Sequence, residues 1–214
     1  MEKVFQSFSL THSYTCSYNV GSYSTNIAYT QDENGYPNAY NALGDFIPAN
    51  ELSQMALTEQ FGPMIGFDMT LKNSMLLKVE YRQSRNISLS FANTQITETT
   101  AKEVAFSAGY RFKDIKIGLV FSGVKRQFVS DLNVTAGFGI KDNQTMLRRV
   151  TEDDDQVTSG ALNVTINAAA DYQFSRLVGL KFYYNQAINK PKNKNQYNNM
   201  NFETGIELKL MLSQ

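Results

Sequence analysis

The chain has 214 residues, and Lys and Arg match Asp and Glu at 20 each. This balance leaves no net field that would draw nucleic acid or an acidic membrane surface to the protein. No run of about 18 apolar residues occurs, which excludes a transmembrane helix, and the single cysteine, Cys16, excludes an intrachain disulfide. The hydrophobic content of 42% still allows a membrane β-barrel, because lipid-facing and water-facing residues alternate along each strand of a barrel.

Period-two patterning begins near the N-terminus. Residues 4–20 alternate between an apolar series and a series rich in serine and threonine, which predicts a β-strand with one apolar and one polar face. Residues 21–52 contain several Gly and Pro residues and form a predicted long loop, which we expect to be extracellular. Alternation returns at 53–71 and again at 75–92, so two more strands are predicted there.

The strongest signal lies at residues 162–174, where every even position is apolar or small and most odd positions are polar. Such a segment is long for a soluble strand, which has about 5–6 residues, whereas a strand that crosses a bilayer needs about 9–11. The same pattern predicts six further strands, at residues 104–112, 115–121, 128–140, 144–150, 178–184 and 200–212. Residues 1–214 are therefore predicted to form one all-β unit, an antiparallel up-and-down transmembrane β-barrel wall of about ten strands.

The predicted connections alternate in length along the chain. Short turns are expected near residues 73, 113, 142 and 176, and longer loops at 21–52, 93–101, 122–126, 151–158 and 189–198. Outer-membrane barrels have this rhythm, with short periplasmic turns and longer external loops. The rhythm therefore favours the outer membrane of a Gram-negative bacterium.

The two clearest turns predict which charged residues face each other. The turn near residue 73 places Asp68 opposite Lys78 on the polar face. The turn near residue 176 likewise places Asp171 opposite Lys181. Nine charged residues in the polar phase are predicted to face the lumen: Asp68, Lys78, Glu80, Arg82, Asp171, Lys181, Glu203, Glu207 and Lys209.

Few residues of the sequence suggest a catalytic or metal-binding site. His12 is the only histidine and falls in the apolar phase of its strand, whereas a catalytic base needs an orienting partner within hydrogen-bond reach. Cys16 shares that phase and is predicted to be a small buried hydrophobic residue. The acidic run at 152–155 lacks the spacing of a calcium loop. We therefore expect no enzyme activity, no catalytic residue, no metal ion and no cofactor.

Several longer segments of the sequence are distinctive. They are residues 61–98, which begin FGPMIGFDMTLKNS, and THSYTCSYNVGSY (11–23), GYRFKDIKI (109–117), SDLNVTAGFGIKDNQTMLRR (130–149) and NVTINAAADYQFSRLVGLKFYYNQAINKP (163–191). In wording, order and spacing they resemble the C-terminal part of the SprA/Sov proteins. These are the outer-membrane translocons of the type 9 secretion system, also called gliding-motility proteins. The resemblance covers nearly the whole chain.

The resemblance implies an architecture and a role in protein transport, since the family has no catalytic motif to carry over. Its members are very large single-chain barrels, and the largest known barrels reach about 36 strands. This chain would then supply C-terminal strands to the wall of a translocation channel. The implied partners are the lipid bilayer, the remaining strands of the same barrel, a PorV-type small barrel, a periplasmic plug and secreted cargo proteins, with no nucleic acid.

Three other hypotheses stay open at this point. The first is a small closed outer-membrane barrel of about ten strands that acts as a porin or adhesin. The second is an outer-membrane enzyme with catalytic residues on its loops, which the lone histidine disfavours. The third is a soluble β-sandwich, for which the predicted strands are too long.

Overall fold

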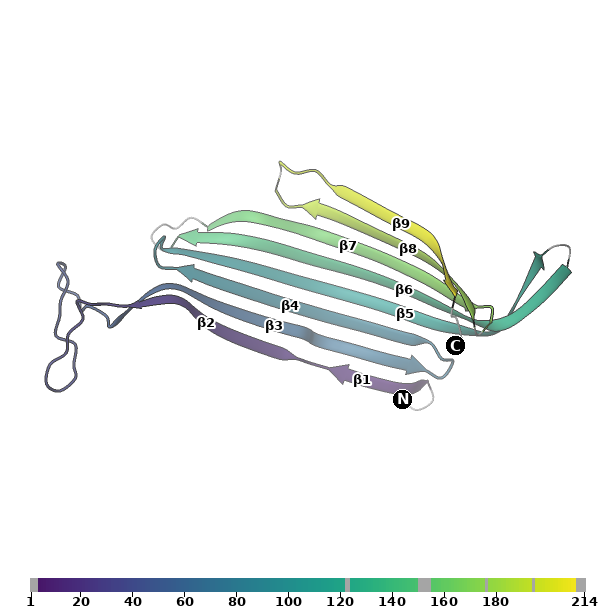
Figure 1. Cartoon of the computed structure of the whole chain (residues 1–214), viewed down its shortest axis with the longest axis horizontal. Coiled ribbons are helices and arrows are strands. Elements are labelled where there is room, and N and C mark those ends of the chain that lie inside the picture. The colour runs from purple at the N-terminus through teal and green to yellow at the C-terminus, as the bar shows by residue number, and fades with distance from the viewer. Residues whose placement is uncertain (1–3, 122–123, 150–154, 176, 194, 211–214) are drawn as a thin grey trace.

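The computed structural model describes residues 4–121, 124–149, 155–175, 177–193 and 195–210. These residues form one antiparallel sheet of nine strands with turns and loops between them (Figure 1). The strands are β1 Phe5–Thr11, β2 Tyr14–Thr25, β3 Asn50–Leu71, β4 Leu76–Ser90, β5 Gln95–Phe121, β6 Val124–Arg149, β7 Asp155–Gln173, β8 Val178–Pro191 and β9 Asn199–Leu210. In this part of the chain, no helix has the length and apolar character that crossing a bilayer requires.

The sheet is an up-and-down meander in which each strand from β3 onward pairs with the next one along the chain. The strand predicted at 4–20 is divided into β1 and β2, which both pair with β3 and together form one edge. The chain leaves the ladder between them at His12 and Ser13. There the Ser13 N–H donates to the Pro63 carbonyl at 2.9 Å, and the Gly62 N–H donates to the Ser13 carbonyl at 3.0 Å. The two halves of the edge strand therefore stay in line.

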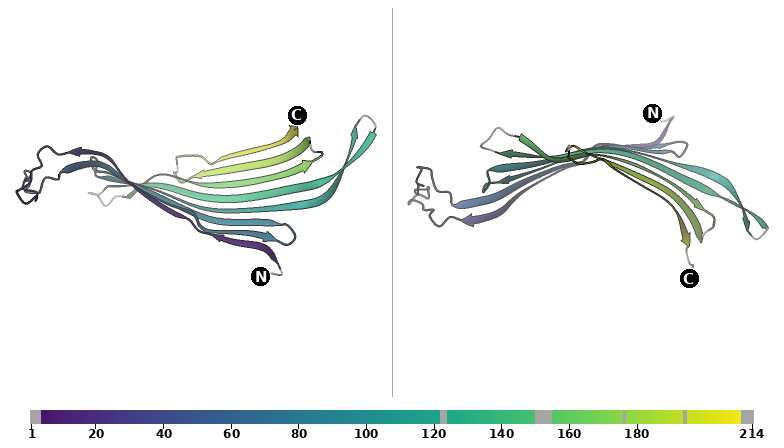
Figure 2. Two further views of the ribbon diagram at one scale, coloured as in Figure 1. Left: turned by 60° about the horizontal axis from the view of Figure 1, so that its bottom comes forward. Right: turned by 90° about the horizontal axis from the view of Figure 1, so that it is seen from above.

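The sheet is a single curved layer with two separate edges (Figure 2). β9 forms one edge, β1 with β2 forms the other, and no pairing among the described residues joins them. One layer is not a sandwich, so the soluble β-sandwich is wrong for the described part of the chain. An open, curved, up-and-down sheet is consistent with part of a larger barrel.

The sheet has almost no hydrophobic core of its own. In the described residues Tyr172 is the only buried hydrophobic residue, with 4% of its surface exposed. The accessible surface of the chain is 15691 Å², whereas a compact monomer of this mass exposes roughly 10,000 Å². Because hydrophobic burial is the main favourable term in folding, this sheet requires lipid or further protein against its apolar side chains.

The tight turn predicted at Lys113 and Asp114 is wrong, because β5 continues through this point. The two residues form a β-bulge: the pairing with β6 shifts between Phe112 and Ile115, and Asp114 has a φ of 54°. The Asp131 carboxylate accepts the Asp114 N–H at 3.1 Å and holds the bulge. Two predicted strands are therefore one strand with an inserted residue.

The turn predicted at Asp142 is also wrong. Asp142 lies inside β6, opposite Lys102 of β5, so the strands predicted on either side of it are one. At this height both faces of β6 are polar, and the period-two signal disappears although the ladder continues. For the same reason β5 already begins at Gln95, inside the predicted loop 93–101. The two mergers remove two of the ten predicted strands, and the division of the strand predicted at 4–20 adds one, which gives the nine strands of the described residues.

The connections alternate between the two ends of the sheet (Figure 1). One end carries the longest loop, residues 26–49 between β2 and β3, which lies within the predicted 21–52. The other end carries the turn predicted near residue 73, which is closed by a 2.8 Å hydrogen bond from the Leu71 N–H to the Met75 carbonyl. The longest loop and the turn near residue 73 therefore lie at opposite ends, as the sequence predicts. The predicted alternation fails at other connections: four residues join β4 to β5, as many as join β3 to β4, and the β5–β6 connection, predicted as a longer loop, lies at the same end as the turn near residue 73.

Two predicted loops fall partly outside the described residues. The loop predicted at 122–126 is too long, since Phe121 pairs with Val124 and only two residues, outside the described part, lie between them. Residues 152–154 of the acidic run also lie outside it, while Asp155 begins β7.

The β5–β6 hairpin extends beyond its neighbours (Figure 2). Pairing with β4 stops at Gly109 and pairing with β7 stops at Leu132, so the outer part of the hairpin pairs only with itself. Tyr172 supports its base, because the phenol donates toward the carbonyl oxygens of Ile115 and Phe128, at 2.9 and 3.1 Å. This position explains why Tyr172 is buried in a sheet that has no second layer.

Candidate functional site

One face of the sheet is apolar over a limited height, which we call the apolar band. On β5 it runs from Val104 to Phe112, over nine residues. The pairing aligns these with apolar or small residues on neighbouring strands, among them Ile65, Phe67, Leu77, Val79, Tyr81, Phe138, Ile140, Val164, Ile166, Phe182, Ile188, Met200 and Phe202. A tilted strand crosses bilayer hydrocarbon in about 9–11 residues, so the band has the height of a membrane.

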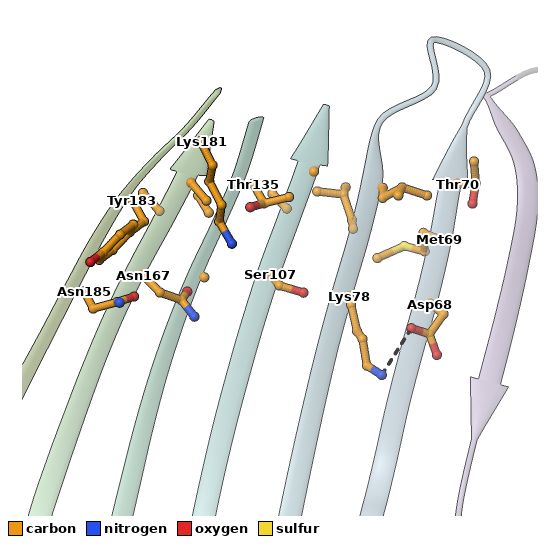
Figure 3. Close-up of a pocket in the computed structure, with 18 of the residues that line it drawn as sticks. Asp68, Met69, Thr70, Lys78, Ser107, Thr135, Asn167, Lys181, Tyr183 and Asn185 are labelled. Atoms are coloured by element: carbon orange, nitrogen blue, oxygen red, sulfur yellow. Dashed lines mark ion pairs between the residues drawn. The ribbon is translucent and has the colours of Figure 1, made fainter. Parts of the chain in front are cut away.

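The opposite face is polar. One row across six strands consists of Lys78, Ser107, Gly137, Asn167, Asn185 and Glu203. A hollow of about 830 Å³ lies against this face, and its lining residues come from every strand between β3 and β9 (Figure 3). Because one hollow contacts strands so far apart, the polar face is the concave side of the curved sheet.

The pairing places all nine charged residues of the predicted set on this polar face. Asp68 lies opposite Lys78, with 3.7 Å between Oδ1 and Nζ (Figure 3). Asp171 lies opposite Lys181, which lies opposite Glu207 in turn. Both hairpin registers predicted from the sequence are confirmed. The set is completed by Glu80, Arg82, Glu203 and Lys209.

Glu80 joins several of these charges into a chain along the polar face. It is only 7% exposed, and its oxygens Oε1 and Oε2 lie 2.9 Å from Nζ of Lys78 and 2.5 Å from Nη2 of Arg82. Asp68 extends the chain beyond Lys78, and Glu103 lies 3.6 Å from Arg82. A buried carboxylate is stable only when it is paired and hydrogen-bonded, so the ionised Glu80 depends on both cations.

A second chain of charges lies on the other face, beyond the end of the apolar band. Its centre is Glu98, which is 8% exposed. Oε1 lies 2.6 Å from Nε of Arg85, and Oε2 lies 3.1 Å from Nη2 of Arg148. Glu59 and Asp155 extend this chain, at 3.8 Å from Arg85 and 3.2 Å from Arg148. The sequence pattern does not reveal the group, because it predicts a loop where β5 carries Glu98.

Glycines of β6 make room for polar side chains on the concave face. A Cβ atom on Gly137 would lie 2.0 Å from Oδ1 of Asn167, and one on Gly139 would lie 2.8 Å from Oγ1 of Thr165. The polar side chains of β7 therefore lie across the glycines of β6. The centre of the hollow is a neutral hydrogen-bonding surface, with charges of both signs around it.

The two residues considered for chemistry in the sequence lie at the N-terminal edge of the sheet. Nδ1 of His12 is 2.6 Å from the carbonyl oxygen of Met64, at the break between β1 and β2. Cys16 is exposed, so the prediction that it is buried is wrong; no second layer covers this part of the edge strand. Among the described residues, no group of His, Cys, Asp and Glu is arranged to hold a metal ion.

Comparison with known proteins does not assign the chain to a family. No protein-family model matches the chain, and no curated protein matches it. Any inference about function therefore depends on two features. One is the contrast between the apolar band on one face of the sheet and the polar opposite face, and the other is the set of sequence segments that resemble the translocon family.

Proposed function

We propose that this chain forms part of the wall of a large β-barrel in the outer membrane of a Gram-negative bacterium. The observation that carries the proposal is an apolar band of membrane height on the convex side of a sheet whose concave side is polar. Outer-membrane barrels have an apolar band about 25 Å tall outside and a polar interior. In this arrangement lipid covers the band, and the charged set from Asp68 to Lys209 borders a water-filled channel.

The channel in this proposal conducts protein, as the resemblance to SprA/Sov translocons of type 9 secretion and gliding motility implies. The polar face carries neutral amides, glycines and charges of both signs, so it has no strong preference for the charge of a cargo. A conduit for folded protein requires many more strands than nine. The unpaired edges at β9 and at β1 with β2 are where further strands of the same barrel pair.

The partners in the proposal are those that the resemblance implies. They are the bilayer, the remaining strands of the barrel, a PorV-type small barrel, a periplasmic plug and secreted cargo, and no enzymatic step is involved. The small closed porin or adhesin is less well supported, because the two edges of the described sheet lie far apart (Figure 2).

Adjacent residues of β7 provide a direct test of the orientation. In the full-length protein with Cys16→Ser, single cysteines replace either Asn167 or Ile166. A water-soluble maleimide that does not partition into membranes should label the Asn167→Cys protein in outer membranes, and should label the Ile166→Cys protein at least about tenfold more slowly. Equal rates, or the reverse order, would contradict the proposed orientation.

The transport role needs its own experiment. Depleting the full-length protein from the cells that make it should trap the secreted cargo proteins in the periplasm. Depletion of an unrelated outer-membrane barrel is the control and should leave their secretion unchanged. If secretion continues at its normal rate after depletion, the translocon role is wrong even where the cysteine labelling supports a membrane wall.

A further inference from the structure

The loop at residues 26–49, which we call the arm, projects from the end of the sheet opposite the start of β1 and the end of β9 (Figure 1). It leaves β2 after Thr25 and returns to β3 at Asn50, whose backbones pair. A hydrogen bond of 2.9 Å from the Asn26 N–H to the Ala49 carbonyl closes its base. The arm therefore begins as a continuation of the edge ladder.

Within the arm the first of two turns is built around Asp32. Its side chain accepts the backbone N–H groups of Asn34 and Tyr36, at 3.0 and 2.8 Å. The Asp32 N–H donates to the Tyr36 carbonyl at 2.9 Å, and the Gly35 N–H donates to the Asp32 carbonyl at 3.0 Å. Gly35 has a φ of 85°, a conformation that glycine adopts without strain.

The second turn repeats this network nine residues later in the sequence, around Asn41. The Asn41 side chain accepts the N–H groups of Leu43 and Asp45, both at 2.9 Å. The Asn41 N–H donates to the Asp45 carbonyl at 2.9 Å, the Gly44 N–H donates to the Asn41 carbonyl at 3.1 Å, and Gly44 has a φ of 88°. The arm is thus a tandem repeat of one turn, which its side chains and glycines specify locally.

This framework presents apolar side chains to solvent. Ile27 is 101% exposed and Leu43 is 87% exposed, and the rings of Tyr36, Tyr40 and Phe46 are also exposed. Only Tyr40 and Phe46 contact each other as rings, at a centroid distance of 4.6 Å. Apolar groups held in fixed positions on an ordered loop are typical of the anchor residues of a protein interface.

The negative charge of the arm limits which kinds of molecule can bind to it. The arm contains no Lys or Arg but three acidic residues, Asp32, Glu33 and Asp45. Anionic lipid headgroups and anionic polysaccharides would be repelled by this surface. The aliphatic Ile27 and Leu43 fit an apolar pocket of a protein better than a sugar ring, whereas the exposed rings of the arm would fit either. A protein surface that joins an apolar pocket to basic residues fits both features.

We propose that the arm is a preformed docking element for a partner protein, which receives Leu43 and the neighbouring aromatic rings in an apolar pocket bordered by Lys and Arg. The hydrogen bonds of the two turns fix the arm before binding, so little conformational entropy is lost when the partner docks. This inference depends on neither membrane orientation nor transport, and it can fail or succeed independently of the proposed function.

A photocrosslinker tests the proposal in the full-length protein, in the cells that make it. Benzoylphenylalanine replaces Tyr36, and the site of each adduct is mapped by mass spectrometry. We expect one partner protein, crosslinked at an apolar surface with Lys or Arg beside it. The variant Leu43→Asp should lower the crosslink yield about tenfold, since anchor residues carry most of the binding energy. Asn93→Asp, in the β4–β5 connection, adds the same charge away from the arm and should leave the yield unchanged.

Charge reversal supplies a second, independent measurement. Asp45→Lys should also lower the yield, and high salt should weaken the crosslink of the unmodified arm, because exposed charges are screened. Several results would overturn the proposal: adducts with lipid or polysaccharide only, adducts only with another part of the same chain, no adduct at all, or a yield that Leu43→Asp does not change.

Discussion

The two buried glutamates, Glu80 and Glu98, have nearly the same surroundings on opposite faces of one sheet. Each is less than a tenth exposed, and each has a different cation at each carboxylate oxygen. Their positions along the strands differ. Glu80 lies on the polar face directly behind the apolar band, whereas Glu98 lies on the face of the band but past its end.

This difference shows where each face is polar. The concave face carries charge through the full height of the band and beyond it. Within the described part of the band the convex face carries no charge, and charge begins past its end, where Lys102 and Asp142 follow Val104 and Ile140 along the same strands. A sheet built only for water would not need this limited apolar stretch, and its height of nine residues corresponds to a bilayer.

The largest loss of stability is expected when a charge is placed on the apolar face inside the band. In the full-length protein, Ile166→Lys should destabilise the folded state in lipid vesicles by about 2–4 kcal/mol, because a cation on the lipid face near the midplane is poorly solvated. The neighbouring Asn167→Lys should change the stability by less than about 0.5 kcal/mol. Denaturant titration in vesicles measures both, and similar losses for the two variants would contradict the assignment of the faces.

The next largest loss of stability is expected when either of the two buried glutamates is neutralised. Glu80→Gln and Glu98→Gln should each cost about 1–2 kcal/mol, because each change removes the charge that two cations share. The cations are partly exposed, so water replaces part of what is lost. The exposed Glu203→Gln is the matched control and should cost much less. If Glu98→Gln behaved like this control, the second charge chain would have no structural role.

A smaller and local effect is expected at the base of the β5–β6 hairpin. Tyr172→Phe keeps the ring but removes the hydroxyl that lies within hydrogen-bond distance of Ile115 and Phe128. We expect a loss of about 1 kcal/mol and faster amide hydrogen exchange in the hairpin, with little change in β8. Uniformly faster exchange across the sheet would show that Tyr172 supports the whole sheet and not the hairpin alone.

The smallest effect is expected at the exposed pair of Asp68 and Lys78. Both side chains are nearly half exposed and 3.7 Å apart, so Asp68→Asn should cost less than about 1 kcal/mol. The cost should vanish near 1 M salt, where the screening length falls to about 3 Å. A larger cost that persists in high salt would mean that this part of the polar face is not in contact with water.

The sequence predicts the fold best where one face of a strand is apolar. In the segment around Ile166 the alternation specifies strand, face and register, and the pairing of Asp171 with Lys181 is correct. It does not specify the strands above the band, where both faces are polar and Asp142 looks like a turn residue. The Glu98 chain lies in that region, so its contacts depend on pairing between distant strands that a local pattern cannot show.

The central claim is that the convex face of the sheet contacts lipid while the concave face contacts water. Spin labels placed one at a time along residues 162–172 of β7 test it most directly, in the full-length protein embedded in a bilayer. Collision with oxygen, which concentrates in lipid, should peak at even positions such as Ile166. Collision with a water-soluble nickel complex should peak at odd positions such as Asn167. Profiles without a period of two, or with the two phases exchanged, would contradict it.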